Sequence, residues 1–522
     1  MTPDLKKRAT VLAIAALLAS CTTIKPPAPG PAASATPPAA PREFRAAWVS
    51  TVANIDWPSK PNLAPGQQQA EALAILDRAK ALNLNAIVLQ VRPSADAIYP
   101  SRLEPWSEYL TGTQGQAPQP AYDPLLFWVT QAHARGLELH AWFNPYRARH
   151  ATAKSPISAD HIARLNPDAV KSYGKFLWMD PGDDSASKQT LAVVLDVVRR
   201  YDIDGVHIDD YFYPYPIEAP GAAGEAAALD GAAAPKTELD FPDQPSWQRY
   251  LLGGGTLDRA SWRRQNVDHL IEALYTGIHH EKNWVRFGIS PFGLGRPDRR
   301  PPGIAGFSQY DKLYANAELW LESGWVDYFT PQLYWPISQA PQAYDVLLDY
   351  WLAQNRKGRH IWPGLFTSRI DAPTKAYPPE EIVQQIGATR ARPGASGHVH
   401  FSMAALMDNR KGISDQLKAG SYASAALVPA TPWLGTLAPG VPTVSSKREA
   451  AALQLKLTPA KGTTQYALWT RYGDEWRFAV VPAARGDWSV ADDARLGAAT
   501  AVVISAVDRL GNEGERLQVP VK

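Results

Sequence analysis

Short apolar runs alternate with longer amphipathic segments along most of the chain. The runs are rich in β-branched and aromatic residues, and they lie at 44–52, 85–92, 137–144, 204–212, 285–292, 326–335, 360–367 and 398–405. A parallel sheet that is covered by helices needs nearly continuous apolar strands. These eight runs therefore predict buried parallel strands.

The segments between the runs carry helical signals. One apolar stripe at i, i+3, i+4 and i+7 is formed by Ala72, Ile75, Leu76 and Ala79, and residues 191–198 repeat it. Asp123-Pro124 reads as the start of a helix and Gly136 as its end. Further helical patterns fill 263–280, 310–323, 341–355 and 379–390. Eight strand–helix units predict a closed (β/α)8 TIM barrel over 43–425. No GxGxxG follows the first run and the sequence contains no Walker motif, which weakens the alternative of an open nucleotide-binding sheet.

The pattern changes at both ends of the chain. Residues 426–442 are proline-rich and predict a linker, and residues 443–522 alternate apolar and polar positions with a hairpin turn at Gly473-Asp474. These features predict a small all-β sandwich of the fibronectin type III kind. Residues 217–260 form a long loop on the barrel, with an Ala/Gly-rich stretch that we expect to be mobile.

The N-terminus has the features of an export signal. A positive stretch at 6–8 precedes the apolar run 11–19, which is too short to span a bilayer. Leu18-Ala19-Ser20-Cys21 resembles the bacterial lipobox, so we expect residues 1–20 to be a signal peptide and Cys21 to be lipidated. Thr22 after the cysteine favours an outer-membrane lipoprotein facing the periplasm. The alternative is an ordinary cleaved signal with a chance cysteine. Residues 21–42 are rich in proline and alanine and predict an extended tether.

Composition narrows the choice of partners. The 522 residues hold 53 Lys and Arg and 51 Asp and Glu, a formal net charge of +2, which gives no reason to expect nucleic acid. Cys21 is the single cysteine, so the chain cannot form an internal disulfide and its fold must depend on the core.

Polar residues follow the predicted strands at the edge where barrel active sites lie. The sharpest signal is Asp209-Asp210 after the fourth run; His207 and Asp209 share one face and should point into the barrel. Two carboxylates beside a sugar bond can act as acid and as base or nucleophile, and their repulsion raises one pKa. The alternative is an Asp that caps a helix or turn. His207 with both carboxylates could instead bind a metal, but His398 and His400 are the only other histidines at a strand end, and His400 is expected to pack in the barrel.

The chain holds 18 tryptophans, several of them near the predicted rim. Aromatic faces pack on sugar rings while amides such as Asn144 and Gln332 bind hydroxyls. The candidate substrate-binding residues are Arg92, Asp96, Glu104, Trp142, Asn144, Tyr146, His207, Tyr211, Gln332, Tyr334 and Trp335. Some of the tryptophans must instead fill the core, especially Trp128 and Trp351 in predicted helices.

Eight stretches resemble the bacterial glycosyl hydrolase-like 10 family: RAAWVSTVANIDWP, LQVRPSADAIYPS, LEPWSEYLTG, YDPLLFWVTQAHARGLELHAWFNPYR, DGVHIDDYFYPYP, WRRQNV, FGISPFG and FTPQLYWP. The resemblance implies a TIM-barrel glycosidase, and one branch is similar to periplasmic lipoproteins that cut peptidoglycan strands stripped of stem peptides. DGVHIDD also resembles the strand-four motif of the α-amylase group, whose nucleophile would fall on Asp209. That group has a glutamate acid after strand five, and FGISPFG has none. Asp210 is then the first candidate acid, followed by Asp96 and Glu104.

These observations leave three hypotheses. The first is a glycoside hydrolase with Asp209 and Asp210 as catalytic carboxylates, without cofactor or metal, acting on peptidoglycan glycan strands. The second is a non-catalytic glycan-binding lipoprotein of the cell envelope, favoured by the missing strand-five glutamate. The third is a lyase or a metal-dependent deacetylase on the same polymer.

Overall fold

The structure, a computed structural model, describes residues 36–218 and 238–521. Within it, Pro38–Lys522 form one compact unit. The predicted signal peptide, Cys21 and most of the predicted tether lie outside the described residues, as does the Ala/Gly-rich part of the loop at 217–260. The predicted limits of the barrel, linker and sandwich domains stay predictions.

Parallel strands form one sheet in the order β10-β9-β8-β7-β3-β2-β1-β12-β11. They are β1 (Phe44–Val49), β2 (Ala86–Arg92), β3 (Glu138–Phe143), β7 (Gly205–Ile208), β8 (Arg286–Ile289), β9 (Tyr328–Phe329), β10 (His360–Ile361), β11 (Gly364–Leu365) and β12 (Gly397–His400). The end strands β10 and β11 are two halves of one segment, separated only by Trp362 and Pro363. Because β10 pairs with β9 and β11 pairs with β12, the sheet closes on itself. The predicted (β/α)8 barrel is confirmed, and each predicted run overlaps at least one strand of it.

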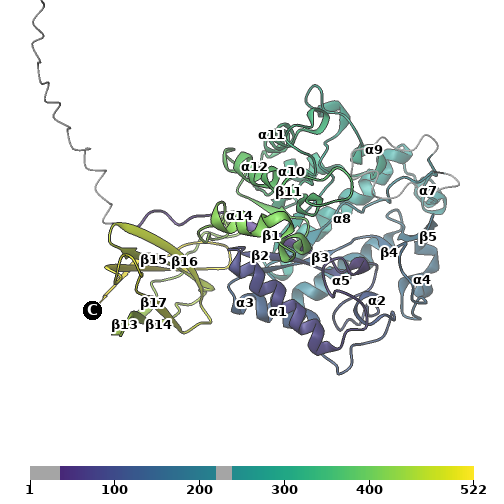
Figure 1. Cartoon of the computed structure of the whole chain (residues 1–522). Coiled ribbons are helices and arrows are strands. Elements are labelled where there is room, and N and C mark those ends of the chain that lie inside the picture. Colours follow the sequence, from purple (N-terminus) through teal and green to yellow (C-terminus); the bar gives the residue numbers. More distant parts are fainter. Residues whose placement is uncertain (1–35, 219–237, 522) are drawn as a thin grey trace, which may run out of the picture. The chain divides into compact units, whose positions relative to one another are not determined.

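Helices cover the outer side of the barrel (Figure 1). The longer ones are α1 (Pro65–Ala81), α3 (Pro124–Ala134), α5 (Asp184–Arg200), α7 (Gln244–Leu252), α8 (Arg259–Glu281), α10 (Ala317–Ser323), α11 (Tyr344–Gln354), α12 (Pro379–Arg390) and α14 (Ile413–Ala419). Helix α12 has the bounds that the sequence predicts. Asp123 caps α3 as expected, since its Oδ1 accepts the Leu126 N–H at 3.0 Å. The predicted stripe of α1 faces the core, where Ala72, Ile75, Leu76 and Ala79 are buried.

Shorter elements lie in the loops between barrel strands and helices. They are α2 (Glu108–Thr111), α4 (Ile162–Leu165), α9 (Gln309–Lys312), α13 (Met403–Met407) and a small antiparallel sheet of β4 (Arg147–Arg149), β5 (Val170–Tyr173) and β6 (Phe176–Met179). Single 3-10 turns lie at Val52–Asn54, Pro167–Ala169, Pro297–Arg299, Ala340–Gln342, Thr367–Arg369 and Arg410–Gly412.

Alternate residues of the strands fill the inside of the barrel. A buried cluster there includes Phe44, Trp48, Trp142, Tyr328 and Trp362. Two strand glycines make room for these rings: a Cβ on Gly288 would lie 2.0 Å from the Tyr328 ring, and one on Gly205 would lie 2.4 Å from His140 Nδ1. The barrel is thus a packed core whose open end is its rim.

The C-terminal module is a sandwich of two antiparallel sheets, β13-β14-β17 and β16-β15-β18-β19. Its strands are β13 (Thr443–Glu449), β14 (Ala452–Thr458), β15 (Gln465–Tyr472), β16 (Glu475–Pro482), β17 (Asp487–Ala491), β18 (Ala501–Val507) and β19 (Leu517–Val519). Residues from both sheets share one buried cluster, including Leu455, Leu468 and Ile504. The hairpin predicted at Gly473-Asp474 joins β15 to β16, whose pairing ends at Tyr472 and Glu475. The predicted sandwich is confirmed.

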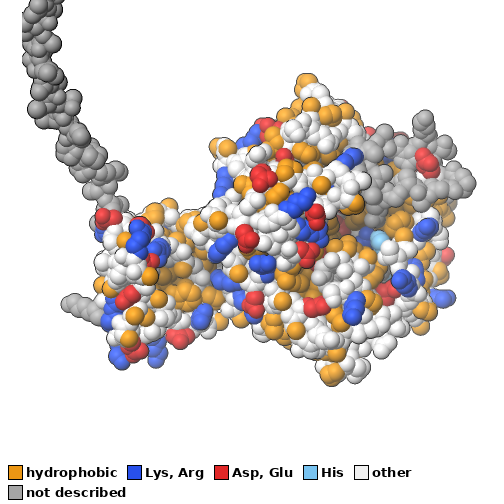
Figure 2. All heavy atoms as spheres, viewed as in Figure 1, with side chains coloured by type: hydrophobic (Ala, Val, Ile, Leu, Met, Phe, Trp, Pro, Cys, Tyr) orange, Lys and Arg blue, Asp and Glu red, His pale blue; other side chains and the backbone are white. Residues whose placement is uncertain are grey.

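Charged side chains of both signs are interspersed over the face drawn in Figure 2, in line with the near-balanced composition. None of the helices in the described residues is both long and apolar enough to span a bilayer.

Candidate active site

A cavity of about 240 Å³ opens at the carboxyl ends of the barrel strands. Its walls come from residues far apart in the sequence: Trp48, Ser50, Val52, Ala53, Ile55, Gln90, Trp142, Arg147, His150, Asp209, Asp210, Tyr211, Ser290, Gln332, Tyr334 and Phe401. Strands β1, β2, β3, β7, β8, β9 and β12 each end at this cavity. Of the described residues that line it, only Asp209 and Asp210 are acidic.

Asp209 follows β7 and is only 3% exposed. Its Oδ2 accepts hydrogen bonds from Trp142 Nε1 at 2.9 Å and Asn144 Nδ2 at 3.2 Å, whereas its buried Oδ1 has no hydrogen-bond partner in the described residues. Burial raises the pKa of Asp209 to about 7; the nearby Arg147 guanidinium lowers it, and the charge of Asp210 raises it further. An oxygen without a partner at a cavity wall is available to a ligand, and the carboxyl can hold a proton near neutral pH.

Asp210 lies beside Asp209 on the same cavity wall and is also 3% exposed. Its Oδ2 accepts a hydrogen bond from the Tyr215 hydroxyl. A hydroxyl donor favours the ionised form of a carboxylate. No helix begins at either aspartate within the described stretch 205–218. The two side chains therefore face the cavity and do not cap a helix.

His207 lies beneath the cavity and is fully buried. Trp48 Nε1 donates to its Nε2 at 3.1 Å, and Ser290 Oγ lies 2.9 Å from the same nitrogen. The ring proton is therefore on Nδ1, which lies 3.2 Å from the Tyr328 hydroxyl. Burial and the nearby His140 hold the pKa of His207 well below its usual range. As expected, His207 and Asp209 both point inward, and the neutral imidazole positions Trp48 and Ser290.

A chain of polar contacts continues from Tyr328 down the barrel. The Tyr328 hydroxyl lies 2.9 Å from His140 Nδ1, and His140 Nε2 lies 3.0 Å from Glu138 Oε2. Arg286 then pairs with Glu138 at 3.0 Å. Buried polar groups that are satisfied in this way make the core rigid and fix the floor of the cavity.

Five of the predicted substrate-binding residues lie at the cavity or on its carboxylate. Trp142, Tyr211, Gln332 and Tyr334 line it, and Asn144 donates to Asp209. Gln332 is held in place by its own donation to Ser290 O at 2.9 Å. The Tyr334 ring packs against Phe366 and Phe401, with centroids 4.7 and 5.9 Å apart, and so forms an aromatic wall.

Other predicted residues are buried away from this cavity. Arg92 and Glu104 form a fully buried ion pair, and Arg92 Nη1 also donates to Asn144 O at 2.6 Å. Asp96 accepts the Ser94 N–H at 2.9 Å, and burial raises its pKa to about 7. Tyr146 bonds Ser187 at 3.0 Å, and Trp335 packs on Phe292. These side chains hold the loops after β2, β3 and β9 and are not part of the cavity wall.

Several residues of the cavity were not among the candidates. Gln90 accepts three contacts from Ser50, Thr51 and Val52 through its Oε1, and its buried Nε2 has no partner in the described residues. Arg147 lies over the Tyr211 ring at 4.7 Å. A glutamine inside the apolar run AIVLQVR was the available signal for Gln90, and the place of Arg147 directly after Tyr146, behind the third run, was the signal for that buried arginine.

In the described parts of the chain, no group of three or more His, Cys, Asp or Glu side chains is arranged to hold a metal ion. The Nε2 atoms of His398 and His400 instead lie within hydrogen-bond distance of the Tyr422 hydroxyl, and His400 Nδ1 lies 2.7 Å from Thr367 Oγ1.

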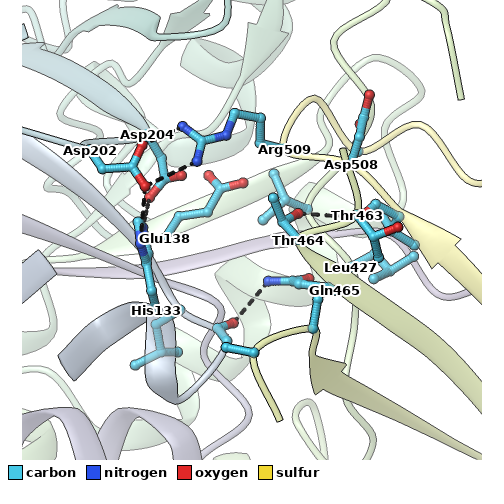
Figure 3. Close-up of a pocket in the computed structure, with 17 residues that line it drawn as sticks. His133, Glu138, Asp202, Asp204, Leu427, Thr463, Thr464, Gln465, Asp508 and Arg509 are labelled. Atoms are coloured by element: carbon cyan, nitrogen blue, oxygen red, sulfur yellow. Dashed lines mark hydrogen bonds and ion pairs between the residues drawn. The ribbon is translucent and has the colours of Figure 1, made fainter. Parts of the chain in front are cut away.

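A second pocket lies at the opposite end of the barrel, against the C-terminal module (Figure 3). Three of its acidic side chains are paired: Asp204 with His133 at 2.8 Å, Asp202 with Arg509 at 2.7 Å, and Glu138 with Arg286. The fourth, Asp508, accepts the backbone N–H groups of Leu510 and Asn512. Gln465 also donates to Gly136 O at 3.1 Å. These contacts join the module to the barrel, and the amino-terminal end of a TIM barrel serves stability rather than catalysis.

Comparisons with known proteins find similar sequences that cover most of the chain. The family model described as Glycosyl hydrolase-like 10 matches residues 43–380. Glycosyl hydrolase YngK of Bacillus subtilis (strain 168) is 40% identical over 455 residues, which cover 84% of each chain. Glycosyl hydrolase DigH of Escherichia coli (strain K12) is 32% identical over 429 residues, covering 76% of this chain and 92% of that protein.

Among solved structures, the PgaB (BpsB) glycoside hydrolase domain from Bordetella bronchiseptica aligns with a TM-score of 0.42 and 14% identity, covering 72% of this chain and 98% of that domain. A similarity at this level carries no argument about function.

Proposed function

The chain belongs to the glycosyl hydrolase-like 10 family, and on that premise we propose that it hydrolyses glycosidic bonds in peptidoglycan strands that lack stem peptides. One observation carries the proposal: the buried Asp209 carboxyl presents an oxygen that has no hydrogen-bond partner among the described residues to an aromatic-lined cavity, with Asp210 beside it. Paired carboxylates of which one holds a proton are the groups that glycoside hydrolysis needs.

The environments of the two carboxyls favour different roles. Asp209 has a pKa of about 7, so its carboxyl can donate a proton to the leaving-group oxygen near neutral pH. Asp210, which accepts a hydrogen bond from the Tyr215 hydroxyl, is the partner that acts as base or nucleophile. The resemblance to the α-amylase group implied that Asp209 is the nucleophile and Asp210 the acid. The proposed assignment exchanges these two roles within the same pair of aspartates.

The remaining wall residues suit a sugar. The rings of Trp48, Trp142 and Tyr334 offer apolar faces, and Gln90 and Gln332 offer amides, in one enclosed space. Rings that pack on the C–H faces of a pyranose and amides that bind its hydroxyls together orient the scissile bond. Asp209 then donates its proton to the glycosidic oxygen while the bond between that oxygen and the anomeric carbon breaks. Water adds a hydroxyl to the anomeric carbon, and the proton that the water loses restores the protonated carboxyl of the pair.

The test is release of soluble glycan from purified sacculi, measured by chromatography of the products. We expect release from sacculi whose stem peptides were removed by an amidase and much less from untreated sacculi. Equal release from both would refute the specificity for bare strands, and no release from either would refute the hydrolase.

The glycan-binding alternative is favoured by one observation: no acidic residue other than the Asp209–Asp210 pair lines the described cavity. It is distinguished by binding without product. A double variant, Asp209→Asn with Asp210→Asn, should still bind strands under either hypothesis, but only the hydrolase loses product release.

The cellular location is part of the proposal and depends on residues outside the described ones. We place the protein on the periplasmic side of the outer membrane, anchored through lipid on Cys21. Labelled palmitate should enter the wild type and not the Cys21→Ala variant, and that variant should leave the membrane fraction. If the wild-type protein incorporated no labelled palmitate and were found in the soluble fraction, that result would contradict the lipid anchor.

A further inference from the structure

A groove of about 650 Å³ lies between the edge of the C-terminal sandwich and the barrel helices, far in sequence from the catalytic aspartates. The groove is lined by Pro38, Pro41, Lys80, Asn83, Lys418, Ala423, Ser424, Ala425, Trp469, Trp476, Arg477, Phe478, Ala479, Val480 and Trp488. Four of these are aromatic, three are cationic and none is acidic. That composition distinguishes the groove from the second pocket, which is lined by four acidic residues.

The aromatic side comes from the sandwich. Trp476 and Phe478 are alternate residues of β16 and therefore point to the same face, about 7 Å apart along the strand. Both are half-buried, as is Trp488 of β17, whereas Trp469 is fully buried behind Phe478, with ring centroids 5.1 Å apart. Strand β16 is an edge strand of its sheet. Among the described residues, the half-buried rings thus form a ledge at the edge of the sheet.

The cationic side brings together two lysines that line the groove and an arginine beside it, from separate elements. Lys80 lies in the last turn of α1, where its Nζ donates to Val480 O at 3.5 Å, and Lys418 lies on α14. Arg485 precedes β17 and does not line the groove, but its guanidinium lies 5.2 Å above the ring of Trp488, which does. Burial, Arg485 and Lys418 together lower the pKa of Lys80, so the three charges act on one another. None of the three forms an ion pair with a carboxylate in the described residues. Arg477 differs, because its guanidinium lies 2.6 Å from Asp493.

Cations that repel one another without a counter-charge cost free energy that an anion can recover. Rings beside them select an anion that carries flat apolar faces, as a pyranose does. We propose that this groove binds a polysaccharide chain bearing carboxylate groups, and that the C-terminal module thereby holds the substrate polymer outside the catalytic cavity.

The choice of glycan rests on the proposed function. Removal of the stem peptides leaves a free lactyl carboxylate on each muramic acid. Bare strands therefore carry negative charges that can act as counter-charges for Lys80, Lys418 and Arg485. Chitin oligosaccharides have a similar amino-sugar backbone without the carboxylate. The pair of ligands therefore separates recognition of charge from recognition of the sugar ring.

Hydrogen–deuterium exchange of the full chain, followed by mass spectrometry, locates the binding. The Asp209→Asn background prevents consumption of the ligand. Edge-strand amides of β16 exchange readily when free, and we expect amidase-released strands to slow exchange over 475–482 whereas chitin oligosaccharides do so weakly. The double variant Lys418→Gln with Arg485→Gln should need about three to ten times more ligand for the same protection, and Trp476→Ala at least about five times more.

The matched control is Lys456→Gln, an exposed lysine of β14 in the same module that does not line the groove. It should leave the protection within twofold. Unchanged exchange at 475–482 with saturating bare strands, equal protection by chitin oligosaccharides, or protection only by vesicles containing anionic lipid would each overturn the proposal. The exchange rates do not depend on turnover. A protein that does not hydrolyse the strands would therefore fail in the product-release assay and would still show protection of 475–482 if the groove binds them.

Discussion

Asp209 should destabilise the folded protein whenever it is ionised, and Asp209→Asn should remove that cost. Burial raises its pKa from 3.8 to about 7. When the pKa of a carboxyl is higher in the folded state than in the unfolded state, the folded state binds its proton more tightly. The resulting contribution to stability is complete at a pH below the unfolded pKa, and it is lost as the pH rises through the folded pKa. A shift of about 3 units at about 1.36 kcal/mol each gives up to about 4 kcal/mol at pH 8. The amide oxygen of asparagine can still accept from Trp142 and Asn144.

The assay is thermal unfolding of wild type and variant between pH 4 and pH 8. We expect nearly equal melting temperatures at pH 4 and a variant that melts several degrees higher at pH 8. Asp204 is the matched control at the other end of β7, because its contacts with His133 help to lower its pKa to about 2. Asp204→Asn should therefore lower the melting temperature at pH 8. An Asp209→Asn variant that is equally or less stable than wild type at pH 8 would show that the carboxyl is not desolvated as described.

Three further changes test the site and its support. Trp142→Phe removes a donor that favours ionised Asp209, so the alkaline limb of the kcat/KM profile should move up by about one to two pH units; an unmoved limb would separate this indole from the titrating group. Glu104→Gln leaves buried Arg92 without its counter-charge and should cost about 3–5 kcal/mol in urea unfolding, and a loss below about 1 kcal/mol would contradict its structural role. Tyr334→Ala removes an aromatic wall and should raise KM for soluble strands severalfold while leaving the melting temperature within a few degrees; an unchanged KM would exclude the ring from substrate binding.

The barrel could be predicted from the sequence because its strands are buried on both sides. A run such as AIVLQVR has no solvated face, so the parallel sheet and its eightfold repeat are visible without any contact information. The inward direction of His207 and Asp209 followed from strand alternation alone. The division of the seventh strand into β10 and β11 around Pro363 needed the structure, because the closure depends on which neighbour each half meets.

Long polar side chains were harder to place. Gln90 and Arg92 both lie at the end of β2, but only Gln90 reaches the cavity. Arg92 instead pairs with Glu104, which lies in the loop that follows β2. The difference lies in tertiary contacts twelve or more residues apart, which spacing does not encode. The same limit applies to the groove on the sandwich, since Lys80, Lys418 and Arg485 are separated by hundreds of residues or by whole domains. Their missing counter-charges become visible only when the elements are brought together.

The central claim is that Asp209 takes part in breaking a glycosidic bond. The most direct measurement is the initial rate of glycan release from amidase-treated sacculi by wild type, Asp209→Asn and the surface control Asp77→Asn, whose parent carboxylate pairs with Arg135 on the outside of the barrel. We predict that Asp209→Asn is at least about a hundredfold slower while it still unfolds cooperatively, and that Asp77→Asn matches wild type. A rate for Asp209→Asn within a few fold of wild type would contradict the account.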